Sequence, residues 1–147
     1  MTTILLLQGA NMNWLGTRQP EIYGTTTAAQ LDDRIRAHAA ENGYTVEIDY
    51  INVEGEAINR VYRAHTEGVD AIVMNPAGYS YAGYALRDAI KGIQVPVVEV
   101  HISNLHRRGF ESVTGEAAEG VVMGFGLHGY ILGLEAALHI ARGGGKE

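Results

Sequence analysis

The stretch Val95-Pro96-Val97-Val98-Glu99-Val100-His101-Ile102-Ser103-Asn104-Leu105-His106 passes from an apolar run into a run of polar side chains. The apolar part predicts a buried parallel strand, and the polar part predicts the loop that follows it. Glu99 and His101 are two positions apart, so on a strand both side chains point to the same face. A carboxylate beside an imidazole fixes the tautomer of the ring, which prepares it as a general acid or base. A buried, hydrogen-bonded polar pair without a catalytic role is the alternative interpretation.

Five short apolar runs predict strands, and helical patterns separate them. The predicted strands are Ile4–Leu7, Val46–Ile51, Ala71–Met74, Val97–Val100 and Val121–Phe125. Four helices are predicted between and after these strands. The first begins at a capping box, Thr27–Gln30, and the second ends at Gly68 and presents Ile58, Val61, Tyr62 and His65 on one face. The third and fourth cover residues 82–91 and 128–142. Such alternation predicts parallel strands joined by right-handed crossovers.

We therefore expect a single α/β domain over residues 1–142, followed by a flexible glycine-rich tail at residues 143–147. Five strand–helix units fit a flavodoxin-like three-layer sandwich, in which a five-stranded parallel sheet has the order 2-1-3-4-5. Ligands bind such sheets beyond the carboxyl ends of the strands, where the strand order reverses. The fold class thus predicts where the functional residues should lie.

The chain has 147 residues, a formal net charge of -6 and no cysteine. This length suits one domain with a sizeable core. The negative charge argues against a nucleic-acid partner, and the lack of cysteine excludes disulfides and thiolate chemistry. No basic region precedes Ile4–Leu7, and no apolar run reaches the length that would span a bilayer. We expect a cytoplasmic protein without a membrane partner.

The loops after strands 1, 3 and 4 carry the polar residues of interest. They cover residues 8–24, 75–81 and 102–108, and they should all open at the same edge of the sheet. The first loop is long and contains Gly16 and Gly24, which suits a mobile lid. The polar side chains expected to meet at this edge are Asn11, Arg18, Tyr23, Asn75, His101 and Ser103.

This set of side chains suits acid–base chemistry on a small anionic ligand. The charge of Arg18 favours the ionised form of Tyr23, which could then act as a base. His101, backed by Glu99, is a candidate acid. Without a metal-ligand set or a nucleophile, these residues predict proton abstraction followed by loss of a leaving group, with no metal. Each residue alone also has an ordinary interpretation, since Asn75-Pro76 is a common turn dipeptide.

Two long motifs resemble the type II 3-dehydroquinate dehydratases. The first loop of that family has the form G-P-N-L-N-x-L-G-x-R-x-P-x-x-Y-G, and residues 9–24 read Gly-Ala-Asn-Met-Asn-Trp-Leu-Gly-Thr-Arg-Gln-Pro-Glu-Ile-Tyr-Gly. The family's E-V-H-I-S-N-x-H-x-R matches Glu99 to Arg108 throughout. Shorter matches lie at Glu54-Gly55 with Ile58, at Asn75-Pro76, at Leu86 to Ala89 and at Gly126 to Tyr130. The resemblance spans essentially the whole chain.

The resemblance implies a cofactor-free anti elimination of water from 3-dehydroquinate, through an enolate, to give 3-dehydroshikimate. Tyr23 would be the base, assisted by Arg18. His101, oriented by Glu99, would protonate the departing hydroxyl, and Asn11 would stabilise the enolate. The implied substrate-binding residues are Asn75, Ile102 and Ser103, which would hold the carboxylate, together with Tyr81, Asp88 and Arg108. The family is a dodecamer, in which Asp88 would reach the site of a neighbouring subunit.

Two positions depart from the family pattern on the side that recognises the ring. The family's third loop reads N-P-G-A-x-T-H-T-S, and the histidine that contacts substrate hydroxyls is Tyr81 here. The last arginine of S-N-x-H-x-R-E-x-F-R is absent, because the segment is one residue shorter and Glu111 lies nearest. If Glu111 turns inward, we expect weak activity on 3-dehydroquinate and better activity on an analogue with altered hydroxyls or a cationic substituent. Alternatively, Arg107 or Arg108 replaces the missing arginine.

Three functions therefore stay open. The first is dehydration of 3-dehydroquinate, and the second is the same chemistry on a related cyclic hydroxy ketone. The third is a non-catalytic, flavodoxin-like binding protein. Formation of a conjugated enone from 3-dehydroquinate separates the first function from the other two.

Overall fold

A five-stranded parallel sheet organises the chain in the computed structural model, which describes residues 1–144. The strands are β1 (Thr3–Ala10), β2 (Thr45–Tyr50), β3 (Ala71–Ala77), β4 (Val97–His101) and β5 (Gly120–Met123). The helices are α1 (Pro20–Tyr23), α2 (Ala28–Asn42), α3 (Glu54–Glu67), α4 (Tyr79–Ala82), α5 (Tyr84–Gly92) and α6 (His128–Ala141), with 3-10 helices η1 (Met12–Trp14), η2 (Leu105–Arg108) and η3 (Thr114–Ala117). The strand order is β2-β1-β3-β4-β5 and every pair is parallel, so the predicted flavodoxin-like fold is confirmed.

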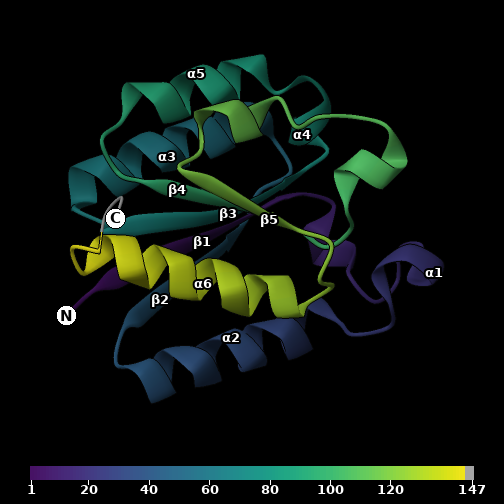
Figure 1. The fold of residues 1–147 in the computed structure, drawn as a ribbon, viewed down its shortest axis with the longest axis horizontal. Coiled ribbons are helices and arrows are strands. Elements are labelled where there is room, and N and C mark those ends of the chain that lie inside the picture. The colour runs from purple at the N-terminus through teal and green to yellow at the C-terminus, as the bar shows by residue number, and fades with distance from the viewer. Residues whose placement is uncertain (145–147) are drawn as a thin grey trace.

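Helices cover both faces of the sheet and form a three-layer structure (Figure 1). α2 and α6 pack on one face, and α3 and α5 pack on the other. Successive side chains of β1 alternate between these faces. Leu6 packs in the cluster that contains Leu31 of α2 and Leu134 of α6. Leu5 packs in the cluster that contains Val61 of α3. The core therefore has two halves, with the sheet between them.

β1 and β3 continue beyond their predicted ends, to Ala10 and Ala77. The predicted strands ended at the last apolar residue of each run. Gln8 of β1 pairs with Asn75 of β3 in the sheet register, and both side chains are buried. Hydrogen bonds satisfy both polar atoms of the Asn75 side chain and the Oε1 of Gln8, which lets buried strands pass through these positions, although among the described residues Gln8 Nε2 has no partner. The pairing carries both strands to the edge where the polar loops begin.

β5 is shorter than predicted, because it ends at Met123 rather than at Phe125. Gly124 follows with a φ of +95°, which lies outside the extended region. Phe125 is exposed. The apolar run was therefore a misleading guide to the strand end, since apolar residues continue where the backbone already turns.

The buried face of α3 differs from the predicted one. Val61 is buried as expected, but Tyr62 and His65 are exposed. Arg60 is buried in their place, because its guanidinium donates to Glu47 of β2 at 2.8 Å. The buried face of α3 is thus shifted from the predicted one: it keeps Val61 and includes Arg60, whose charge is paired.

The helix predicted at residues 82–91 is confirmed as α5, and a short helix that was not predicted, α4, precedes it, with Gly83 between the two. The Gly83 amide donates to the Tyr79 carbonyl oxygen at 2.7 Å. A Cβ at position 83 would lie 2.3 Å from that oxygen, so only glycine allows this close turn. The break places Tyr81 on the short helix beside the polar edge of the sheet.

The end of the described chain follows the predicted pattern only in part. α6 ends at Ala141, and Gly143 has a φ of +85° as the chain leaves the helix. Residues 145–147 of the predicted tail lie outside the described residues. Within residues 1–144, no helix combines the length and the apolar character needed to cross a membrane.

Candidate active site

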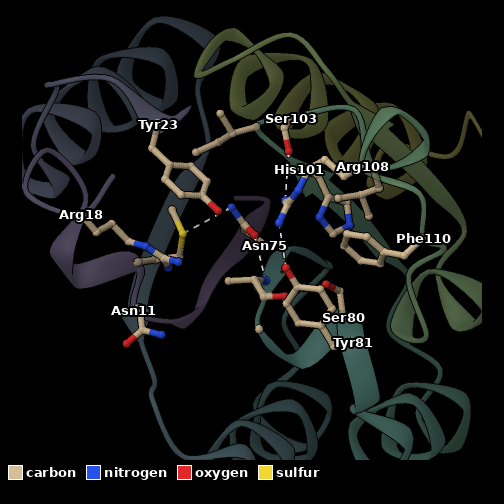
Figure 2. A pocket seen from close by; sticks show the side chains of 15 residues that line it. Asn11, Arg18, Tyr23, Asn75, Ser80, Tyr81, His101, Ser103, Arg108 and Phe110 are labelled. Carbon is tan, nitrogen blue, oxygen red and sulfur yellow. Dashed lines mark hydrogen bonds between the residues drawn. The ribbon is translucent and has the colours of Figure 1, made fainter. Parts of the chain in front are cut away.

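A cavity of about 160 Å³ opens at the carboxyl ends of β1, β3 and β4. This volume is smaller than the ~300–1,000 Å³ typical of drug-sized ligands, so it suits a small molecule. Nine residues predicted from the sequence line it: Asn11, Arg18, Tyr23, Asn75, Tyr81, His101, Ile102, Ser103 and Arg108. The long loop after β1 forms one wall, and the segments after β3 and β4 form the opposite wall (Figure 2).

Glu99 and His101 form the pair that the strand spacing predicts. His101 Nε2 lies 2.7 Å from Glu99 Oε2, and both side chains are almost fully buried. An ionised carboxylate can only accept hydrogen bonds, so it holds the proton of the ring on Nε2 and leaves Nδ1 for other partners. Glu99 itself does not line the cavity but lies behind His101.

Thr114 is a partner of Glu99 that the sequence did not suggest. Its hydroxyl donates to Glu99 Oε1, the oxygen that His101 does not use. Thr114 is buried at the start of η3, where nothing in its sequence neighbourhood points to a site. The carboxylate is therefore oriented from two sides, by a hydroxyl and by the imidazole.

The wall formed by the long loop carries Asn11, Arg18 and Tyr23. The guanidinium carbon of Arg18 lies 4.8 Å from the centre of the Tyr23 ring, a distance at which a cation attracts an aromatic face. Asn11 has a left-handed backbone with φ 69°, and its backbone N–H donates to Asn52 Oδ1 at 2.8 Å. Asn52 thus fixes a strained position at the cavity, a role that the sequence did not reveal. The proposed movement of this loop as a lid stays a prediction.

Asn75 forms part of the cavity floor and is held by buried groups. Its Nδ2 donates to the Tyr130 hydroxyl at 2.7 Å, and its Oδ1 accepts from the Ala77 amide at 3.0 Å. The Tyr130 hydroxyl donates in turn to Gln8 Oε1 at 2.8 Å. Burial raises the pKa of Tyr130, so its hydroxyl keeps its proton and this chain of hydrogen bonds persists at neutral pH. Asn75 is thus both a turn residue and a cavity residue.

The opposite wall contains Tyr81 and Arg108, which are hydrogen-bonded to each other, and the ring of Phe110. Glu111 is exposed and is not part of the lining, so the structure removes the reason to expect a cationic substituent on the ligand. Arg108, the alternative replacement for the missing arginine, does line the cavity. Asp88 does not line it: this exposed carboxylate pairs with the neighbouring Arg87 at 3.1 Å.

The charges around the cavity favour an anion, although the whole chain is negative. Arg18 and Arg108 are both in the lining, and among the described residues the lining contains no carboxylate. The described part of the chain also contains no cluster of three or more His, Asp or Glu side chains placed to hold a metal ion. The side chains present can bind an anion, hold a proton on an imidazole and present a phenol.

A parallel flavodoxin-like sheet with acid–base side chains at its carboxyl edge defines an α/β enzyme with a small polar active site. The family model for dehydroquinase class II matches residues 2–138. The chain belongs to the dehydroquinase class II family. It is 44% identical over 145 residues to a 3-dehydroquinate dehydratase of Thioalkalivibrio sulfidiphilus, covering 97% of this chain and 99% of that one. It is 48% identical over 141 residues to a 3-dehydroquinate dehydratase of Marinobacter nauticus, covering 94% and 97%.

Solved structures agree with this assignment. The crystal structure of a type II dehydroquinase from Butyrivibrio crossotus is 35% identical and superposes with a TM-score of 0.91, covering 93% of this chain and 97% of that one. A 3-dehydroquinate dehydratase-like protein from Bifidobacterium longum is 29% identical and superposes with a TM-score of 0.72. The fold of this chain therefore matches that of a solved type II dehydroquinase over nearly its whole length.

Proposed function

We propose that this chain dehydrates 3-dehydroquinate to 3-dehydroshikimate by an anti elimination through an enolate. Membership of the dehydroquinase class II family supports the reaction and its substrate. The observation that carries the mechanism is the placement of a phenol, Tyr23, and a carboxylate-bound imidazole, His101, around one cavity whose charged side chains are cationic. A base and an acid at one small site suit removal of a proton and loss of a hydroxyl.

The proton-abstraction step belongs to Tyr23. Ionised Tyr23 takes the proton from the carbon next to the ketone, and the charge of Arg18 stabilises the phenolate. The electrons of the broken C–H bond form the enolate. Asn11 supplies hydrogen-bond donors to the enolate oxygen, either directly or through a water molecule.

The leaving-group step belongs to His101. Collapse of the enolate restores the ketone, forms the C=C bond and breaks the C–O bond. His101 acts from its doubly protonated form: it gives its Nδ1 proton to the departing hydroxyl, which leaves as water, and the neutral ring keeps the Nε2 proton that Glu99 accepts. Asn75 and the backbone amides of Ile102 and Ser103 hold the substrate carboxylate during both steps.

The test is an ultraviolet assay for the conjugated enone with purified protein and 3-dehydroquinate. We expect enone formation without any added cofactor. Substrate deuterated at one of the two C2 positions tests the stereochemistry, because an anti elimination removes only the hydrogen that lies on the opposite face from the departing hydroxyl. No enone from the wild-type protein overturns the proposed reaction, and loss of the hydrogen on the same face overturns the anti mechanism. Activity on a different cyclic hydroxy ketone would favour the same chemistry on another substrate.

A further inference from the structure

The wall of the cavity opposite Tyr23 is a single hydrogen-bonded assembly (Figure 2). Arg108 Nη2 donates to the Tyr81 hydroxyl at 2.7 Å, and Nη1 donates to Ser103 Oγ at 3.2 Å. The guanidinium carbon also lies 5.3 Å from the centre of the Phe110 ring. Tyr81 and Phe110 stack with their ring centres 4.7 Å apart. Arg108 is therefore fixed by three side chains, although it lies at the surface.

This assembly presents hydrogen-bond donors to the cavity. A guanidinium has five N–H groups, and Arg108 uses two of them within the described part of the chain. The hydroxyl oxygens of Tyr81 and Ser103 accept these two bonds. Within residues 1–144, the hydrogens of both hydroxyls have no protein acceptor, so they can turn toward a ligand. The assembly thus combines a positive charge with free N–H and O–H groups.

A wall of donors and positive charge favours a carboxylate over a ring hydroxyl. A carboxylate accepts from the free N–H and O–H groups and also brings the negative charge that balances Arg108, whereas a neutral ring hydroxyl brings no charge. The described residues of the lining offer no carboxylate that could neutralise Arg108, and Glu111 lies outside the lining. Charge-assisted bonds from a guanidinium to a carboxylate are among the strongest that proteins form.

We propose that Arg108 is the counter-ion of the substrate carboxylate in this chain, and that Tyr81 is the residue that positions it. This inference rests on the proposed function for the identity of the substrate. It is compatible with a contact between Ser103 and the same carboxylate, since Ser103 and Arg108 are hydrogen-bonded neighbours. Specificity for an acid over its neutral amide would then depend on an arginine that is held by an aromatic hydroxyl.

The experiment compares 3-dehydroquinate with its carboxamide in the wild type, Arg108→Gln and Arg107→Gln. Arg107 is the matched control, because it is the adjacent arginine of η2 but does not line the cavity. For Arg108→Gln we expect KM for the carboxylate to rise by about 10- to 100-fold, the range for a charge-assisted bond, and KM for the carboxamide to change little. Arg107→Gln should alter neither value.

Tyr81→Phe tests the positioning role, because it keeps the ring that stacks on Phe110 and removes the oxygen that accepts from Arg108. We expect a smaller loss of the same preference for the carboxylate, and a double variant no worse than Arg108→Gln alone. Equal losses for both substrates in Arg108→Gln would overturn the proposal. So would a fall in kcat with KM unchanged, because that result would place Arg108 at the reacting atoms.

A binding measurement separates this inference from the proposed function. Quinate and quinamide carry the same carboxylate or carboxamide and have no ketone to react. Calorimetry should find that the wild type prefers quinate and that Arg108→Gln has lost this preference. If the wild type does not turn over 3-dehydroquinate but this binding difference holds, only the proposed function fails. If quinate binds the two proteins equally, or does not bind the wild type, the role of Arg108 is wrong.

Discussion

Glu99 is a buried carboxylate with a hydrogen bond to each of its two oxygens. One partner is the His101 ring and the other is the Thr114 hydroxyl. A buried polar group is costly unless it is hydrogen-bonded, so these two contacts stabilise the position of the carboxyl group beside the imidazole. The structure thus extends a pair that the sequence suggests to three residues on two separate segments.

The first prediction concerns this triad. His101→Ala should abolish turnover while a substrate-like ligand still binds, and Glu99→Gln should lower kcat because it disturbs His101. Since both act through the same imidazole, the double variant should be no worse than the worse single one. Stopped or continuous enone assays measure this, and losses that add on a logarithmic scale would contradict the coupling.

Thr114 extends this test to a residue outside the cavity. Thr114→Val should lower kcat by about 10-fold without a matching rise in KM, because the substrate never touches this side chain. Thr114→Ser is the matched control, since it keeps the hydroxyl and should restore most activity. Equal damage from both variants would indicate a packing role instead.

The second prediction concerns Tyr23 as the base. Tyr23→Phe removes only the hydroxyl, so kcat should fall by about 10²- to 10⁴-fold with KM little changed. Arg18→Ala should do similar damage, because the guanidinium near the ring no longer stabilises the phenolate. A Tyr23→Phe enzyme that keeps most of its activity would end this assignment.

Among the elements, α6 approaches the sheet so closely that glycine is required. A Cβ at Gly133 would lie 2.4 Å from Val100 Cγ2 of β4 and 3.4 Å from Val73 Cγ1 of β3. The same helix carries Tyr130, which holds Asn75 at the cavity floor. The distance between α6 and the sheet therefore affects both the core and the site.

The third prediction follows from this contact. Gly133→Ala should lower the free energy of unfolding by about 1–3 kcal/mol, because the extra methyl overpacks the core. Gly55→Ala on α3 is the control: a Cβ there meets nothing within 4 Å, and alanine favours a helix. Urea denaturation measures both variants. A stable Gly133→Ala protein would mean that Val100 can move aside at little cost.

At the scale of the whole molecule, four tyrosines are held in their neutral form. Burial raises the pKa of Tyr44 and of Tyr79 to about 12, and it raises the pKa of Tyr50 and Tyr130 as well. In an unfolded chain a tyrosine ionises near pH 10. These tyrosines therefore bind their protons more tightly in the folded protein than in the unfolded chain.

The fourth prediction is alkaline unfolding that these tyrosines drive. Their contribution to stability is complete below pH 10 and is lost as the pH rises from 10 toward 12, because the unfolded chain releases its protons first. Far-ultraviolet circular dichroism and tyrosinate absorbance should change together in this range. Tyr44→Phe should make the pH dependence shallower. Ionisation of all four residues in a chain that keeps its helical signal would contradict the prediction.

The fifth prediction concerns assembly. The resemblance implies a dodecamer in which Asp88 reaches a neighbouring site, and in the single chain Asp88 is exposed and lies outside its own cavity. Light scattering should find a species near twelve times the 15.9 kDa chain. Asp88→Ala and Tyr23→Phe chains, mixed after dissociation, should regain up to about a quarter of the wild-type activity. A fully active monomer, or no recovery on mixing, would contradict shared sites.

The sequence by itself determined the order of strands and helices, the edge of the sheet where the cavity opens and six of the polar residues that line it. Local rules suffice for these: apolar runs predict strands, glycine and capping residues mark helix ends, and parallel strands bring their following loops to one edge. Glu99 and His101 were predictable because their spacing of two is itself a local signal. The spacing of apolar residues did not predict the buried face of α3, because Arg60 is buried there through its ion pair with Glu47.

Only the tertiary structure decided which groups support the residues of the candidate site. Thr114 behind Glu99 and Tyr130 behind Asn75 come from distant parts of the chain, and no periodicity links them to their partners. The sequence left open whether Glu111 or an arginine faces the ligand. In the structure Arg108 lines the cavity, because its guanidinium donates to Tyr81 and Ser103, whereas Glu111 is exposed outside the lining. Hydrogen bonds across the fold depend on three-dimensional proximity, which a local sequence pattern does not contain.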